Sequence, residues 1–441
     1  MSDTDFFNFI FHHWGEYLIY TAVFVFICYM SVRNMAYSII DPIHYFFAFG
    51  TGTAYSIVMI LWVHDYIDNL LFAMIFSNLL LMIISWRASY STPKFTITGT
   101  TKNIFYTCEL NRNVIFSFLI VMYVILTAFY IHSVSFAAFV QSRFEANKGL
   151  GAVVRVLDVI RLMLAGYFSV MAYKNKGFKR FNYAFLAILI SIIASFVSGA
   201  KFSLLEHLLV SITAIYIYSG WRPKVNFRFI MISGLLGSVL IGYVLYMLTY
   251  TSESLGYTSS NYIDAPVVVE LFFMRIFANG DAYYFSLPNG VIDTLHVENP
   301  VYQLFGYIIG NGGMQSLFGY NYSDNDVGRL IWKNWYPWDT IARGPTSHFD
   351  LAGYSYFGFI GGLLMTCAIG WVLGRVCAAK KRNMGCGMVF FSSFMATFYC
   401  RALQLLLSPP VGIAYIFDML IFTLFLMVFS QIIRFSSPIK K

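Results

Sequence analysis

Runs of apolar residues about as long as a bilayer is thick limit the fold of this chain more than any other feature. The 441-residue sequence shows them repeatedly, and one run contains the segment FLIVMYVILTAFY. About 20 apolar residues cross a hydrocarbon core as a helix. A membrane-spanning barrel would instead need short segments that alternate between apolar and polar residues. We therefore predict an all-α, polytopic integral membrane protein.

Composition and charge agree with this class and argue against others. Hydrophobic residues make up 59% of the chain and charged residues 11%, against about 45–50% and 25% in soluble domains. The net charge of +8 comes mainly from short loops beside apolar runs, so it indicates membrane topology rather than nucleic-acid binding. The six cysteines lack zinc-ligand spacing and give no disulfide framework. The acidic N-terminus MSDTDFF leads us to expect no cleavable signal peptide.

The apolar runs and the basic residues together predict a topology. We expect eleven spans, at about 16–32, 42–63, 69–85, 113–132, 153–173, 181–197, 202–220, 229–250, 356–376, 386–406 and 411–433. One alternating set of loops holds 19 of the 29 Lys and Arg residues, and cytoplasmic loops carry such an excess. The N-terminus is then outside and the C-terminus cytoplasmic.

This topology places one long segment outside the cell membrane. Residues 251–355 follow the first eight predicted spans (1–250) and precede the last three spans and a cytoplasmic tail (356–441). Loops of this length are usually functional or have structure of their own. The cytoplasmic loops are short and contain no Gly-rich phosphate-binding turn. We therefore expect the chemistry at the external face, in the periplasmic loop 251–355.

Ten basic residues break the bias of Lys and Arg toward the cytoplasmic loops, because they lie on the external side of the membrane or within the spans. A bound anion such as a lipid pyrophosphate would explain them, since Arg and Lys stabilise phosphate oxygens. Charged residues inside a span also point to function by default. Arg155, Asp158 and Arg161 could instead neutralise one another along one helix face, and Lys201 could extend to the headgroups. The predicted pyrophosphate-binding residues are Arg143, Arg155, Arg161, Lys201, Arg275, Arg329 and Arg343.

The end of the long loop, RLIWKNWYPWDTIARGPTSHFDLAGYSYFGFIGG (329–362), contains the candidate catalytic residue. A sugar hydroxyl that attacks a glycosyl phosphate needs a base, and His348 has the side chain best suited to proton transfer near neutral pH. The alternative is a structural histidine. Trp332, Trp335 and Trp338 could stack on sugar rings or belong to an interfacial helix.

Two further sets of polar residues receive a more limited interpretation. Glu206 and His207 lie in an apolar helix, where they could bond to polar side chains of neighbouring helices. Asp324 and Asp326 match the Asp-x-Asp of metal-dependent sugar transfer. A polyprenyl pyrophosphate donor already carries its leaving group, which Arg and Lys can stabilise. We therefore expect neither a metal nor another cofactor.

The layout resembles the O-antigen polymerases, which join oligosaccharide repeat units, and more distantly the O-antigen ligases. Both families combine many spans with one large periplasmic loop in the C-terminal third. The His348-Phe349-Asp350 sequence running to Gly358 is similar to the ligase signature, with Phe349 where the ligases usually have Asn. Ser198-Gly199-Ala200-Lys201 is similar to a family motif that more often ends in Arg.

The resemblance implies a glycosyltransferase in the bacterial inner membrane. It would join undecaprenyl-pyrophosphate-linked repeat units at the periplasmic face in lipopolysaccharide biosynthesis, among membrane lipids and with a chain-length regulator as a further partner. A ligase that transfers the same donor to the lipid A core is one alternative. A flippase or transporter of the lipid-linked unit is another, although no inverted repeat is evident. We expect no nucleic-acid partner.

Overall fold

The computed structural model of the chain describes residues 1–92, 99–134, 147, 149–198, 203–223, 226–254, 267–340 and 343–436. Within these ranges all regular structure is helical, and eight helices are long and apolar enough to cross a membrane. This confirms the all-α class, and the eight apolar helices agree with a multi-pass membrane protein.

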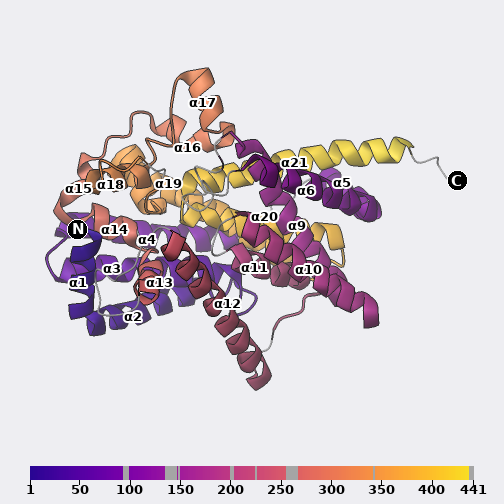
Figure 1. Cartoon of the computed structure of the whole chain (residues 1–441), viewed down its shortest axis with the longest axis horizontal. Coiled ribbons are helices and arrows are strands. Elements are labelled where there is room, and N and C mark those ends of the chain that lie inside the picture. Colours follow the sequence, from indigo (N-terminus) through magenta and orange to yellow (C-terminus); the bar gives the residue numbers. More distant parts are fainter. Residues whose placement is uncertain are drawn as a thin grey trace.

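One group of helices comes mainly from the start of the chain and lies on the left in Figure 1. It combines four N-terminal helices and a π-helix with a long C-terminal helix that packs closely on α4. The turn between α1 and α2 is a single residue. The elements are α1 (Asp3–His12), α2 (Trp14–Val32), η1 (His44–Thr51), α3 (Gly52–Val63), α4 (Asn69–Ser91) and α19 (Phe349–Arg382).

The second group occupies the right side of Figure 1 and is built around α9, which packs on α6, α10, α11 and α20. Its elements are α5 (Gly99–Leu110), α6 (Arg112–Ser133), α9 (Gly151–Lys174), α10 (Gly177–Ser198), α11 (Ser203–Ser219), α20 (Val389–Ala402), η3 (Leu403–Leu406) and α21 (Pro409–Ser436). In the same view α21 extends toward the C-terminus, at the right.

Residues 227–335, which lie between α11 and α19 in the sequence, are also helical where the structure describes them. This region contains α12 (Phe227–Ser254), α13 (Val267–Phe277), α14 (Asp281–Ser286), η2 (Pro288–Gly290), α15 (Val291–Thr294), α16 (Pro300–Ile309), α17 (Asn311–Phe318) and α18 (Val327–Trp335). Tyr284 donates a hydrogen bond to Asp3 at 2.7 Å and its ring stacks on Phe6 at 3.9 Å. The described part of the long segment is therefore folded, and it packs on the N-terminal helix.

Two glycines explain how closely α19 and α4 pack. A Cβ atom on Gly370 would lie 2.0 Å from the Ser85 hydroxyl oxygen, and one on Gly374 would lie 2.5 Å from the Trp86 carbonyl oxygen. Small residues let helix backbones approach in this way inside a membrane. The close contact holds α19 in place. The first turn of α19 directly follows His348, the predicted catalytic residue.

The number and edges of the spans differ in part from the sequence prediction. The predicted spans 153–173, 202–220 and 229–250 overlap α9, α11 and α12, which are helical but are not among the eight apolar helices. Helix α9 carries several charges, and α11 has only 17 residues. The count of eleven thus stays a prediction. The span was predicted from residue 356, but its helix begins earlier, at Phe349. The apolar run is continuous only after Gly358, where the helix is broken (φ 68°), so the sequence marked only that later part.

Candidate functional site

Four charged side chains from three helices meet inside the second group, and we call them the arginine cluster: Asp158, Arg161, Glu206 and Arg401. Arg161 lies 2.8 Å from Asp158 and 3.8 Å from Glu206. Arg401 lies 3.5 Å from Glu206 and 3.8 Å from Asp158. Each arginine therefore faces both acids, and only one of the four contacts is short.

The cluster is buried but its hydrogen bonds are incomplete. Arg161 and Arg401 are 6% and 3% exposed. Within the described part of the chain, Nε of Arg161 and both ring nitrogens of the adjacent, fully buried His207 have no hydrogen-bond partner. Nε of Arg401 and Oε1 of Glu206 have only their 3.5 Å contact with each other. Buried polar groups are nearly always satisfied, because an unpaired one costs about 1–3 kcal/mol.

Local sequence explains how the helices bring these side chains together. Asp158 and Arg161 are three residues apart on α9, so they share one helix face. Gly166 lets α9 approach α20, since a Cβ there would lie 3.2 Å from the Cα of Ser393. The guanidinium of Arg401 lies 4.1 Å from the centre of the Tyr415 ring. Close helix packing thus places the two arginines beside the same pair of acids.

Arg155, on the same helix as Arg161, has a different environment. Its guanidinium pairs with Asp418 of α21 through two nitrogens and donates hydrogen bonds to the carbonyl oxygens of Tyr307 and Ile308 at 3.0 and 2.5 Å. The two carbonyls lie at the end of α16 in the long segment. Arg155 thus ties this segment to the membrane helices. The expected pairing along α9 is found for Arg161 and Asp158, whereas Arg155 pairs with Asp418 instead.

His348 lies just before α19 and is also buried, with 1% of its surface exposed. Neither ring nitrogen has a well-formed hydrogen bond among the described residues. Burial lowers the pKa of His348, while the nearby Asp350 and the backbone of Asn279 act in the opposite direction. The imidazole is therefore kept neutral at neutral pH, which is the form that can accept a proton.

The surroundings of His348 are rigid. Its backbone N–H donates to the carbonyl oxygen of Leu407 at 2.8 Å, and its φ of 52° is unusual for a residue other than glycine. Asp350 accepts hydrogen bonds from Tyr55 at 2.7 Å and Tyr283 at 2.9 Å. Leu407 follows the α20 and η3 segment that carries Arg401. One segment therefore both fixes the backbone of His348 and supplies an arginine of the cluster.

Arg329 and Arg343, predicted to bind pyrophosphate, have structural contacts within the long segment. Arg329 is buried and donates to the carbonyl oxygens of Asp339 at 2.5 Å and Arg343 at 3.3 Å. Arg343 bonds to the Asp339 carboxylate at 2.5 Å. In the described residues no hydrogen bond or ion pair links either arginine to Arg161. The structure thus does not join these three into one site.

The three tryptophans differ in their surroundings. Trp332 donates its indole N–H to Asp339 at 2.7 Å, and Trp335 donates to the carbonyl oxygen of Phe285 at 2.8 Å. Trp338 is 75% exposed. Stacking on a sugar ring stays a prediction for all three, and Trp338 has the most accessible ring.

The remaining predicted residues cannot be placed in either site. Arg143 and Lys201 lie outside the described residues, and Arg275 is on α13 with a side chain that also lies outside them. Arg401 is not among the binding residues predicted from the sequence. A charged residue inside a predicted span, at 386–406, was the signal that could have selected it.

Two hollows on the protein surface lie away from the arginine cluster. An open, apolar groove of about 540 Å³ lies between α6 and α21 and includes Val121 and Phe429. A second hollow, of about 370 Å³, includes Arg112 and Tyr183. Neither is lined by Arg161, Glu206 or Arg401.

Comparison with protein family models, curated proteins and solved structures finds no significant match to this chain. Two features of the residues themselves point to a function. One is the incompletely satisfied arginine cluster, and the other is the buried, neutral His348, which is held by the segment that carries Arg401.

Proposed function

We propose that the protein is a membrane-embedded glycosyltransferase that polymerises polyprenyl-pyrophosphate-linked oligosaccharides, as the resemblance to the O-antigen polymerases implies. The observation that carries the proposal is the arginine cluster, in which two buried arginines share two acids through contacts that are mostly 3.5 Å or longer. Arginine binds phosphate oxygens through two parallel hydrogen bonds. Buried arginines whose contacts with carboxylates are this long are therefore suited to a pyrophosphate.

In this proposal Arg161 and Arg401 bind the pyrophosphate of the donor. Their contacts with Glu206, at 3.8 and 3.5 Å, are long enough for a dianionic group to compete with the carboxylate. Charge builds up on the leaving pyrophosphate as its bond to the anomeric carbon breaks. Fixed positive groups in a water-poor site stabilise such charge strongly. The arginines thus accelerate departure of the polyprenyl pyrophosphate.

His348 is the proposed base for the acceptor. The acceptor hydroxyl oxygen forms a new bond to the anomeric carbon, the bond from that carbon to the pyrophosphate oxygen breaks, and the hydroxyl proton passes to a ring nitrogen of His348. The proposal draws support from burial, which lowers the pKa of His348 and keeps the ring neutral. Both ring nitrogens also lack a well-formed hydrogen bond among the described residues.

Arg161→Ala and Arg401→Ala test the assignment in protein reconstituted with lipid-linked repeat units. We expect each to lower turnover by about 10²–10³-fold, as for other lost charge-stabilising donors. Arg161→Lys should recover part of the activity, because one ammonium cannot replace two parallel hydrogen bonds. Arg382→Ala is the matched control, because it removes an exposed arginine at the C-terminal end of α19, the end opposite His348. Full activity in both Ala variants would exclude the cluster from the reaction.

A transporter of the same lipid-linked unit is the second candidate. The balance of two acids and two arginines inside the helices favours it, because charge networks of this kind form transport pathways in membrane proteins. The discriminating measurement places donor and acceptor on the same face of a liposome. A polymerase lengthens the glycan there, whereas a transporter yields only single repeat units moved across the membrane.

A further inference from the structure

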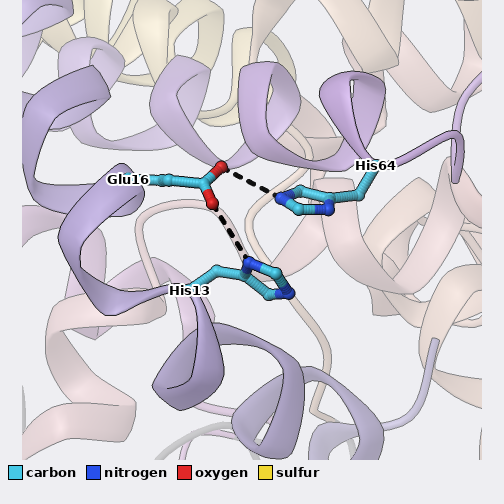
Figure 2. Close-up of side chains that lie close together, drawn as sticks. All are labelled: His13, Glu16 and His64. Carbon is cyan, nitrogen blue, oxygen red and sulfur yellow. Dashed lines mark hydrogen bonds and ion pairs between the residues drawn. The ribbon is translucent and has the colours of Figure 1, made fainter.

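A second constellation lies away from the arginine cluster, where α1, α2 and α3 meet. His13 joins α1 to α2, Glu16 is on the first turn of α2, and His64 follows the last residue of α3. Figure 2 shows the Glu16 carboxylate beside the two neighbouring imidazole rings, with one oxygen directed to each ring. The distances are 3.2 Å from His13 Nδ1 to Oε1 and 3.0 Å from His64 Nε2 to Oε2.

We propose that His13, Glu16 and His64 bind one divalent metal ion of the Zn²⁺ class. The three potential ligand atoms lie within 4.8 Å of one another. Zinc binds imidazole nitrogen and carboxylate oxygen at about 2.0–2.2 Å, so two ligands on a tetrahedral ion are about 3.4 Å apart. The two hydrogen-bond distances already match this separation, and a small rotation of the rings would centre all three ligands on one ion.

The surroundings hold the two rings in this position. The Phe9 ring lies 4.9 Å from the His13 ring and 5.3 Å from the His64 ring, measured between centroids. The two imidazoles are 3.9 Å apart. Each imidazole can donate a nitrogen lone pair to a metal. Two rings this close, with the Glu16 carboxylate beside both, can therefore supply ligand atoms to one ion.

Exposure and ligand number define the type of site. The three side chains are between 24% and 44% exposed, so water or an external ligand can reach a bound ion. Two His and one Glu, completed by water, are a known ligand set for zinc with an open position. The ion would also connect the start of α2 to the end of α3. The set escapes motif recognition because His64 is 48 residues from Glu16.

Metal binding to the full chain, purified without an oligohistidine tag and reconstituted in lipid nanodiscs, tests the proposal. After removal of metal by a chelator, Co²⁺ is titrated and its visible absorption recorded, because four-coordinate Co²⁺ absorbs far more strongly than aqueous Co²⁺. Competition with Zn²⁺ then gives the Zn²⁺ dissociation constant. We expect one equivalent to bind and Zn²⁺ to displace it.

His13→Ala, His64→Ala and Glu16→Gln should each weaken binding by more than the roughly 100-fold that loss of an outer partner of a metal ligand causes. His12→Ala is the matched control, since His12 is an exposed neighbour whose ring bonds to the Asn8 carbonyl oxygen. Melting curves without metal confirm that each variant is folded. Retention of one tight site in His64→Ala and Glu16→Gln, or no site in the folded wild type, would overturn the proposal and leave a hydrogen-bonded His-Glu-His cluster. Because glycosyl transfer is not the readout, this result is independent of the proposed function.

Discussion

Two buried charge groups in this protein differ in how completely they are satisfied. Asp41 and Lys380 are fully buried and directly paired. The Asp41 carboxylate also accepts hydrogen bonds from the backbone N–H groups of Tyr37 and Ile43 and from the Tyr399 hydroxyl. The Lys380 ammonium lies 4.1 Å from the centre of the Tyr399 ring. This pair is satisfied by contacts within the protein.

The arginine cluster contains more charges and fewer short contacts. Its acids and arginines balance, yet three of its four ion pairs are 3.5 Å or longer. His207 beside it has no hydrogen-bond partner in the described part of the chain. A buried charge with all its partners stabilises one structure, whereas buried groups that lack partners can bind something else. The comparison favours a structural role for Asp41 and Lys380 and agrees with the binding role proposed for the cluster.

The largest effect is expected from breaking the satisfied pair. Lys380→Met leaves the Asp41 carboxylate buried without its cation and should lower the free energy of unfolding by about 3–5 kcal/mol. Asp41→Asn combined with Lys380→Met removes both charges and should recover most of the loss. Thermal unfolding in detergent measures both variants. A single variant as stable as the wild type would contradict the structural role.

The second prediction concerns His348, which resembles the cluster in having unsatisfied nitrogens. If it is the base, His348→Gln should lower turnover by about 10²–10⁴-fold with little change in donor binding. Glutamine keeps a hydrogen-bonding side chain but cannot accept the proton. Reconstituted polymerisation assays measure turnover. Near-normal turnover would make His348 a structural residue and shift attention to Glu206 and Asp350.

The third prediction concerns Arg155, which is satisfied like Lys380 but partly exposed. Asp418→Asn weakens the charged, two-nitrogen contact that positions Arg155, whose guanidinium donates to the carbonyl oxygens of Tyr307 and Ile308 in α16. Hydrogen bonds to charged groups contribute about 1.5–3 kcal/mol, so local opening of residues 300–309 should increase accordingly. Limited proteolysis of the reconstituted protein measures this opening. Asp324→Asn, at an exposed pair with Lys333, is the control and should change it little.

The helices were easier to predict from the sequence than the site. Apolar runs mark most spans because each run is both long and continuous, and the structure confirms the helical class. The first turn of α19 was missed because Asp350 and Gly358 interrupt the apolar pattern, although Asp350 is bonded to Tyr55 and Tyr283 from distant parts of the chain. Such partners have no signature in the local sequence.

The candidate site was predicted only in part, for the same reason. Charge inside a span selected Arg155 and Arg161 equally. Only the packing of α16 and α21 shows that Arg155 is tied to these helices, whereas Arg161 pairs with Asp158 and stays the proposed binding residue. The His13, Glu16 and His64 set depends on contact between α2 and α3. Sequence spacing identifies residues on one helix face, whereas a site built from several helices requires the tertiary structure.

The smallest expected effect is a dependence of stability on pH that comes from His348 and not from the Asp41–Lys380 pair. The ordinary pKa of a histidine is 6.5, and burial lowers it in the folded protein. Above pH 6.5 the ring is neutral in both the folded and the unfolded chain, so it adds no pH dependence. As the pH falls below 6.5, the unfolded chain binds the proton first and stability decreases, by at most about 1.4 kcal/mol per pH unit for one proton. The decrease ends once the pH is below the folded-state pKa, where both states are protonated.

Unfolding of the wild type and of His348→Gln between pH 8 and pH 5 gives the difference in stability between the two proteins. The two curves should run parallel above pH 6.5 and diverge below it, with the wild type losing more. Parallel curves over the whole range would mean that the ring can be protonated in the folded protein without penalty, and a base held neutral by burial would then be excluded.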